Sequence, residues 1–67
     1  MYMRYTERTV TYYIHGKEVT PKMFYNFIRD KPLRRGEGVA FNQSRYDRYI
    51  HFWAGYTNVA TIQITVI

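Results

Sequence analysis

Cysteine is absent from the sequence, so disulfide bridges and thiolate metal sites are excluded. The two histidines, His15 and His51, lie far apart, and neither belongs to a metal-binding motif. We therefore expect no metal and no cofactor. The sequence also has no apolar run of about 18 residues, the length that a transmembrane helix needs. Since its first residues have no apolar core of signal-peptide type, we expect a cytoplasmic protein with no membrane partner.

Acidic residues are scarce: five Asp and Glu stand against ten Lys and Arg, which gives a formal net charge of +5. This balance favours acidic partners such as nucleic acid or an acidic protein surface. The five acids are scattered among the bases, so no carboxylate pair is indicated for acid–base catalysis. The single serine, Ser44, lies beside Arg45 and outside any nucleophile motif. We expect a protein that is not an enzyme.

The chain is short, and its 67 residues predict a single domain, 1–67. A domain of this size buries only about 60% of the surface that its unfolded chain exposes, so its core is small. Aromatic residues make up 19% of the sequence, and each ring can bury about 150–250 Å². A dense aromatic core can compensate for this small buried area, and so can oligomerisation. We therefore expect a protein partner or self-association.

The first half of the sequence predicts a hairpin followed by a helix. Residues 2–14 are rich in Tyr, Thr, Val and Ile and alternate in polarity, which predicts a strand. Gly16 favours a tight turn into a short return strand at 18–19. A helix is expected at 21–30, because Thr20 is suited to cap it and apolar residues recur at helical spacing.

The second half predicts mainly strands. Segment 31–38, with two glycines and a proline, predicts a polar loop, and 39–41 a short strand. Residues 44–54 fit either a helix capped by Ser44 or a strand, and their aromatic and β-branched content favours the strand. Strict alternation at 57–67 predicts another strand. The expected fold is α+β: a single antiparallel or mixed sheet of about four to five strands, with one helix packed on one face.

Six basic residues gather in segment 29–48, and two tyrosines interleave with the last of them. Exposed rings can stack on nucleobases while guanidinium groups contact phosphates, although no nucleic-acid-binding motif is present. The glycines of 34–38 also suggest a loop that holds an anion through free backbone N–H groups. The candidates for nucleic-acid or anion binding are Arg29, Lys31, Arg34, Arg35, Arg45, Tyr46, Arg48 and Tyr49.

Charged residues are absent from the last nineteen positions, 49–67. A strand without charge at a sheet edge favours association, because natural edges usually carry Lys, Pro or a bulge. Segment 57–67 is therefore expected either inside the sheet or in an interface with a second subunit or a partner. The interface candidates are Trp53, Tyr56, Ile62, Ile64 and Val66.

The stretch YYIHGKEVTPKMF, residues 12–24, resembles a strand–turn–helix pattern of many small uncharacterised phage and prophage proteins. The resemblance implies an accessory protein that binds a host or defence component, or nucleic acid, in the host cytoplasm. The pattern is structural and carries no functional residue across.

Four functions fit the sequence. The first is a non-enzymatic binding module, for example a phage-type accessory or inhibitory protein that acts through protein–protein contact. The second is a nucleic-acid-binding protein that uses the basic Arg/Tyr patch. The third is a small basic endoribonuclease with His51 as the base and Arg45, Arg48 and Tyr49 nearby. The fourth is an oligomer that holds a small anionic nucleotide.

Overall fold

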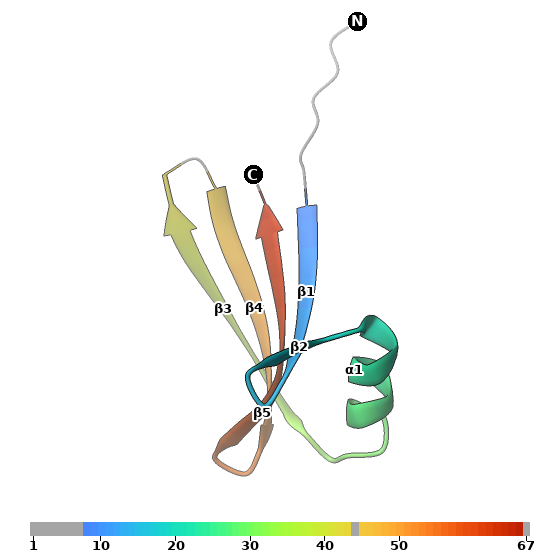
Figure 1. Cartoon of the computed structure of the whole chain (residues 1–67). Coiled ribbons are helices and arrows are strands. Elements are labelled where there is room, and N and C mark those ends of the chain that lie inside the picture. Colours follow the sequence, from blue (N-terminus) through green and yellow to red (C-terminus); the bar gives the residue numbers. More distant parts are fainter. Residues whose placement is uncertain (1–7, 44, 67) are drawn as a thin grey trace, which may run out of the picture.

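The computed structural model describes residues 8–43 and 45–66. The first six residues of the strand expected at 2–14, and Ser44, fall outside the described residues. The elements are β1 (Arg8–Ile14), β2 (Lys17–Val19), α1 (Pro21–Ile28), β3 (Arg34–Asn42), β4 (Arg45–Ala54) and β5 (Thr57–Val66). The strands form one antiparallel sheet in the order β2-β1-β5-β4-β3 (Figure 1). An α+β fold with a single antiparallel sheet and one helix in the described part of the chain is thereby confirmed.

The ambiguous segment at 44–54 is a strand, as its aromatic and β-branched content favoured. It forms β4, which pairs with β3 on one side and β5 on the other. Residues 57–66 of the charge-free stretch form β5, which lies in the middle of the sheet, between β1 and β4. Ile67 is outside the described residues. The backbone of β5 therefore has no free edge, and the expectation of an inner strand is confirmed.

The polar loop predicted at 31–38 is wrong over most of its length. β3 begins at Arg34 and pairs with β4 residue by residue as far as Asn42. Glycine is a poor strand former because it has no side chain to pack. Here Gly36 and Gly38 lie opposite His51 and Tyr49 and pair with them in the ladder between β3 and β4. The segment is consequently part of the sheet and not an anion-binding loop.

The predicted turn and helix cap are present. His15 and Gly16 both have positive φ, 49° and 80°, a combination that two-residue hairpin turns of type I′ require. The side-chain oxygen of Thr20 accepts a hydrogen bond from the backbone N–H of Met23 at 3.2 Å. α1 ends at Ile28, two residues before the expected end. Among the described residues, no helix is long and apolar enough to cross a membrane.

The register of the strands shows which side chains share a face, since side chains alternate along a strand. One face, here the Tyr12 face, carries Val10, Tyr12, Ile14, Ile50, Phe52, Ala60, Ile62 and Ile64. The other, the Tyr13 face, carries Thr9, Thr11, Tyr13, Tyr49, His51, Trp53, Thr61, Gln63 and Thr65. One face is thus mainly apolar and the other mainly polar and aromatic.

The core lies on the Tyr12 face. Phe24 of α1 is fully buried, and its ring centroid lies 5.1 Å from that of Tyr12 and 5.8 Å from that of Phe52. The other buried apolar residues of the described chain are Val59, Ala60 and Ile62, all on β5. Four buried side chains make a small core, as the length of the chain led us to expect.

Candidate functional site

A column of three rings follows β4 on the Tyr13 face. Tyr49, His51 and Trp53 share this face because they occupy alternate positions of one strand. The rings of Tyr49 and His51 are nearly parallel, 6° between their planes and 5.7 Å between their centroids. The centroids of His51 and Trp53 are 6.1 Å apart at 57°. All three side chains are half-buried, so each retains exposed ring surface.

On the β3 side of this column, the residues paired with Tyr49 and His51 are glycines and carry no side chains. Gly36 pairs with His51, and Gly38 pairs with Tyr49. A Cβ atom built on Gly36 would lie 3.5 Å from Nε1 of Trp53, an ordinary contact, so the indole lies close against the bare backbone of Gly36. Around Gly38 no atom lies within 4 Å of such a Cβ. The glycines therefore leave the rings accessible from the edge of the sheet.

The β5 side of the column is a row of hydrogen bonds that orients His51. The amide nitrogen of Asn58 donates to the carbonyls of Phe52 and Ala60, at 3.1 and 3.0 Å. Its Oδ1 is thus the acceptor for the hydroxyl of Thr61, at 3.2 Å. Since that hydroxyl has one proton, Thr61 Oγ1 must accept from Nδ1 of His51, 3.1 Å away. Neutral His51 therefore carries its proton on Nδ1, and Nε2 is left as an acceptor.

Guanidinium groups lie at both ends of the column. Arg34 pairs in register with Trp53, and its Nη2 donates to the carbonyl of Gly55 at 3.1 Å. Arg45, at the start of β4, is exposed and falls on the same face by alternation. Asp47 lies between Arg45 and the rings, and its carboxylate accepts a hydrogen bond from Thr65 at 2.7 Å. The ring column is thus flanked by two cations and one hydrogen-bonded acid.

The predicted basic patch is not one surface. Alternation along β4 puts Tyr46 and Arg48 on the Tyr12 face, and Arg45 and Tyr49 on the opposite one. Arg35 also lies on the Tyr12 face, opposite Phe52. The structure therefore brings Arg34, Arg45 and Tyr49 to one side and separates them from the other strand candidates.

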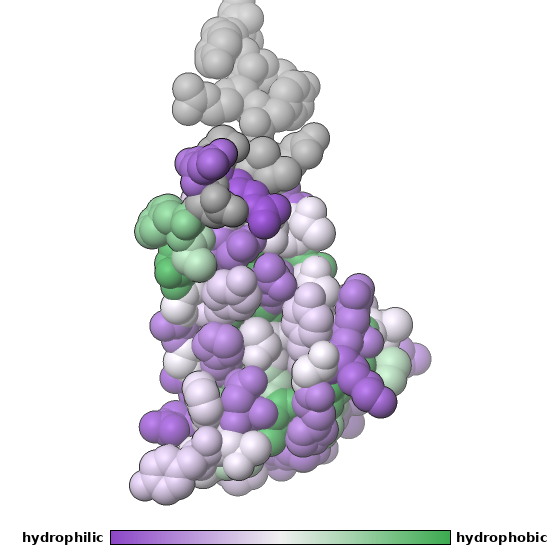
Figure 2. Space-filling view, turned by 60° about the vertical axis from the view of Figure 1, so that its left-hand side comes forward, coloured by the Kyte–Doolittle hydropathy of each residue, from purple (hydrophilic) through white to green (hydrophobic). Residues whose placement is uncertain are grey.

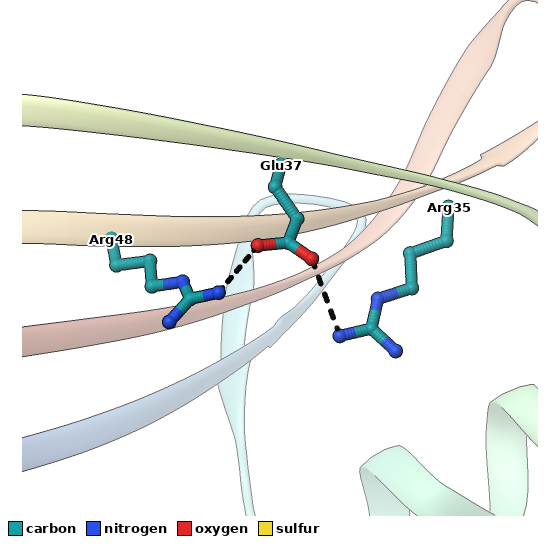
Figure 3. Close-up of polar contacts among 3 residues, drawn as sticks. All are labelled: Arg35, Glu37 and Arg48. Carbon is teal, nitrogen blue, oxygen red and sulfur yellow. Dashed lines mark hydrogen bonds and ion pairs between the residues drawn. The ribbon is translucent and has the colours of Figure 1, made fainter.

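A single carboxylate partly neutralises the cations of the Tyr12 face. Nη2 of Arg48 lies 2.7 Å from Oε1 of Glu37, and Nη2 of Arg35 lies 3.6 Å from Oε2 (Figure 3). The hydrogen bond and the charge of Arg48 lower the pKa of Glu37, and the same contact raises the pKa of Arg48.

The candidates near the end of α1 are also in contact with neighbours. Arg29 Nε lies 3.7 Å from the carboxylate of Asp30, with both side chains well exposed. Nζ of Lys31 donates to the carbonyl of Phe27 at 2.7 Å and lies 4.0 Å from the centroid of its ring. The bond from Lys31 to the carbonyl of Phe27 caps the C-terminal end of the helix, so Lys31 has a structural role of its own.

The interface candidates are dispersed. Trp53 belongs to the ring column, and Tyr56 lies in the turn between β4 and β5, 97% exposed. Ile62 is part of the core, 9% exposed, and reaches no surface partner in the folded chain. Ile64 and Val66 are half-buried on the Tyr12 face.

The sequence analysis did not include Tyr13 in the candidate site, although its hydroxyl donates to Oε1 of Gln63 on the same face, at 3.3 Å. It considered His51 only as the base of a ribonuclease. The signal was present, because Tyr49, His51 and Trp53 alternate in the sequence. Gly36 and Gly38, which pair with His51 and Tyr49, were assigned to a loop. Their position beside the three rings was therefore not predicted.

Aromatic and hydrogen-bonding side chains make up most of the Tyr13 face. No group of three or more metal-ligating side chains occurs among residues 8–43 and 45–66. Of the residues considered for a ribonuclease, Arg45, Tyr49 and His51 share the Tyr13 face, whereas Arg48 lies on the other. Aromatic faces, hydroxyls, an amide and the free Nε2 of His51 are what a ligand on this face would meet.

Comparison with known proteins gives no relative: no family model, no curated protein and no solved structure matches the chain.

Proposed function

We propose that this chain is a non-enzymatic binding module that holds single-stranded nucleic acid on the Tyr13 face of its sheet. The observation that supports it is the column of Tyr49, His51 and Trp53, beside two glycines that leave the rings accessible. Nucleobases stack on such rings whatever their sequence, because every base has a π-face. In this proposal α1 packs only on the Tyr12 face, through Phe24, and the Tyr13 face stays open.

The charges support an anionic ligand. The chain carries a net charge of +5, and Arg34 and Arg45 flank the ring column at its two ends. A strand of nucleic acid along β4 would place bases on the rings and phosphates near these guanidinium groups. Side chains on one face of a strand repeat every 7 Å or so, so the column offers a short series of stacking positions. We expect the module to act in the cytoplasm, that of the host if the chain is phage-encoded.

The direct test is fluorescence anisotropy with a labelled single-stranded oligonucleotide at low salt. Trp53 is the only tryptophan of the chain, so a stacked base should also quench its fluorescence. Tyr49→Leu should weaken binding about 5- to 150-fold, because loss of one base–ring stack costs about 1–3 kcal/mol. Tyr56→Leu is the matched control, since Tyr56 is 97% exposed outside the column, and it should leave the affinity unchanged.

Salt dependence tests the two arginines. For a single strand, the logarithm of the binding constant should fall with the logarithm of salt with a slope near −0.7 per phosphate contact, hence about −1.4 if Arg34 and Arg45 each hold one. Arg45→Gln should reduce the slope by about half. No anisotropy change at low salt, or equal losses in Tyr49→Leu and Tyr56→Leu, would overturn the proposal.

A further inference from the structure

Apolar side chains are exposed on the Tyr12 face at the end of the sheet away from α1. A helix of eight residues extends about 12 Å, whereas the ten residues of β4 or β5 extend about 33 Å. In Figure 1 α1 lies beside the other end of the strands. Beyond it, Phe41 is 81% exposed and Val39 is 52% exposed, and Figure 2 shows hydrophobic residues gathered at this surface. Tyr46 contacts Phe41, with 5.7 Å between ring centroids.

The same residues lie on the edge strand β3, whose two halves differ in charge. The first half carries Arg34, Arg35 and Glu37, which discourage pairing with another strand. The second half, 39–41, carries no charge and no proline. The opposite edge strand, β2, has three residues, of which two are charged. The second half of β3 is therefore an unprotected and apolar stretch of sheet edge.

We propose that this half of β3 pairs antiparallel with the same segment of a second copy of the chain, with Ala40 opposite Ala40. In that register Val39 of one copy faces Phe41 of the other, twice, on the Tyr12 face. A register centred on Gly38 would instead put Phe41 opposite Arg35 and Val39 opposite Glu37. The register centred on Ala40 thus pairs apolar side chains with each other, whereas the register centred on Gly38 pairs them with charged ones.

The positive charge of the chain does not prevent this pairing. Arg48 is the cation nearest the segment, since it pairs with Val39 in register, and it is bonded to Glu37 of its own chain. The two β4 strands would be three strand spacings apart, about 14 Å, whereas charges are screened beyond about 8 Å at physiological salt. Arg34 and Arg35 fall outside the paired segment.

Sedimentation equilibrium of the full chain over a range of concentrations tests the association. The contact is small, so we expect a weak dimer whose fraction rises with concentration. Phe41→Gln should be a monomer at every concentration, and it keeps the net charge of the chain. The matched control Tyr56→Gln changes an exposed ring of the β4–β5 turn and should associate like the wild type.

Cysteine cross-linking tests the register, because the chain has no other cysteine. Directly opposite residues of antiparallel strands have Cα atoms about 4.5–5.5 Å apart, within the range that a disulfide spans. Ala40→Cys should therefore form a covalent dimer on mild oxidation. Gly38→Cys should not, because the two positions 38 would lie four residues apart along the strands, about 13 Å.

Three results would overturn the inference. If the wild type stays monomeric at the highest attainable concentration, the second half of β3 does not pair with a second copy of the chain. Association of Phe41→Gln equal to that of the wild type would place the contact elsewhere. Cross-linking of Gly38→Cys as fast as Ala40→Cys would show a different register.

Discussion

Phe24 is the one fully buried large side chain of the described residues, and its ring centroid lies 5.1 Å from that of Tyr12 on β1. Truncating a buried Phe to Ala costs about 3–5 kcal/mol, whereas a domain of this length has roughly 3–10 kcal/mol of stability in total. We therefore expect Phe24→Ala to be largely unfolded at 25 °C by circular dichroism. Met23→Ala, at the neighbouring position that is 55% exposed, should change the unfolding midpoint little. A cooperative Phe24→Ala transition near that of the wild type would contradict this.

Glu37 gives the fold a contribution that depends on pH. Arg48 lowers its pKa in the folded chain below the ordinary value of 4.5, so the folded state binds this proton less readily than the unfolded state. The contribution is present above about pH 4.5 and is lost as the pH falls through the lowered value. The difference in urea midpoint between wild type and Glu37→Gln should thus shrink from pH 7 to about pH 3.

The matched control for this measurement is Glu18→Gln on β2, since Glu18 forms no ion pair with the described residues. The difference in urea midpoint between wild type and Glu18→Gln should not shrink in this way from pH 7 to about pH 3. A Glu37→Gln difference that is constant from pH 7 to pH 3 would show that the contact with Arg48 does not stabilise the fold.

At the scale of elements, the β1–β2 hairpin depends on a backbone conformation that few side chains adopt. Gly16 has φ of +80°, and a left-handed conformation costs a residue with a Cβ about 1–2 kcal/mol. Gly16→Ala should lower the free energy of unfolding by that amount in urea titrations. Gly38→Ala is the control, because its Cβ meets no atom within 4 Å and no positive φ occurs there. Equal losses in both variants would contradict a role of the turn.

Local signals were sufficient for most elements and insufficient for β3. Thr20 and Pro21 define the start of α1 through capping chemistry, and strict alternation defines β5, because both effects act within a few residues. Segment 34–38 has the composition of a loop, and it is a strand only because β4 lies beside it. Such long-range pairing overrides local preference, so no window of the sequence alone indicates it.

The candidate site was missed for a different reason. Tyr49 was recognised as a possible stacking residue, but it was grouped with Tyr46 and Arg48, which point to the opposite face. Once 44–54 is assigned as a strand, alternation separates these residues and joins Tyr49 to His51 and Trp53. Segment 44–54 was correctly favoured as a strand, but its alternation was not applied to the binding candidates, so the expected patch combined residues of both faces.

At the scale of the whole molecule, the two proposals use two different surfaces of the sheet. The Tyr13 face carries the ring column, and the apolar end of the Tyr12 face, with the β3 edge, carries the contact with a second copy. Antiparallel pairing at an edge relates the copies by a two-fold axis perpendicular to the sheet. Both Tyr13 faces would then lie on the same side of one continuous sheet.

This arrangement predicts a dependence of affinity on oligonucleotide length. A strand of about five nucleotides is expected to reach one ring column and one of about sixteen to reach two, and the second contact is then intramolecular. The longer oligonucleotide should bind the wild type markedly more tightly than the shorter one at concentrations where the dimer forms. Phe41→Gln, matched in charge, should bind the short oligonucleotide like the wild type and lose the advantage of the long one. An equal length dependence in both proteins would mean that the ring columns act separately, even if each binds nucleic acid.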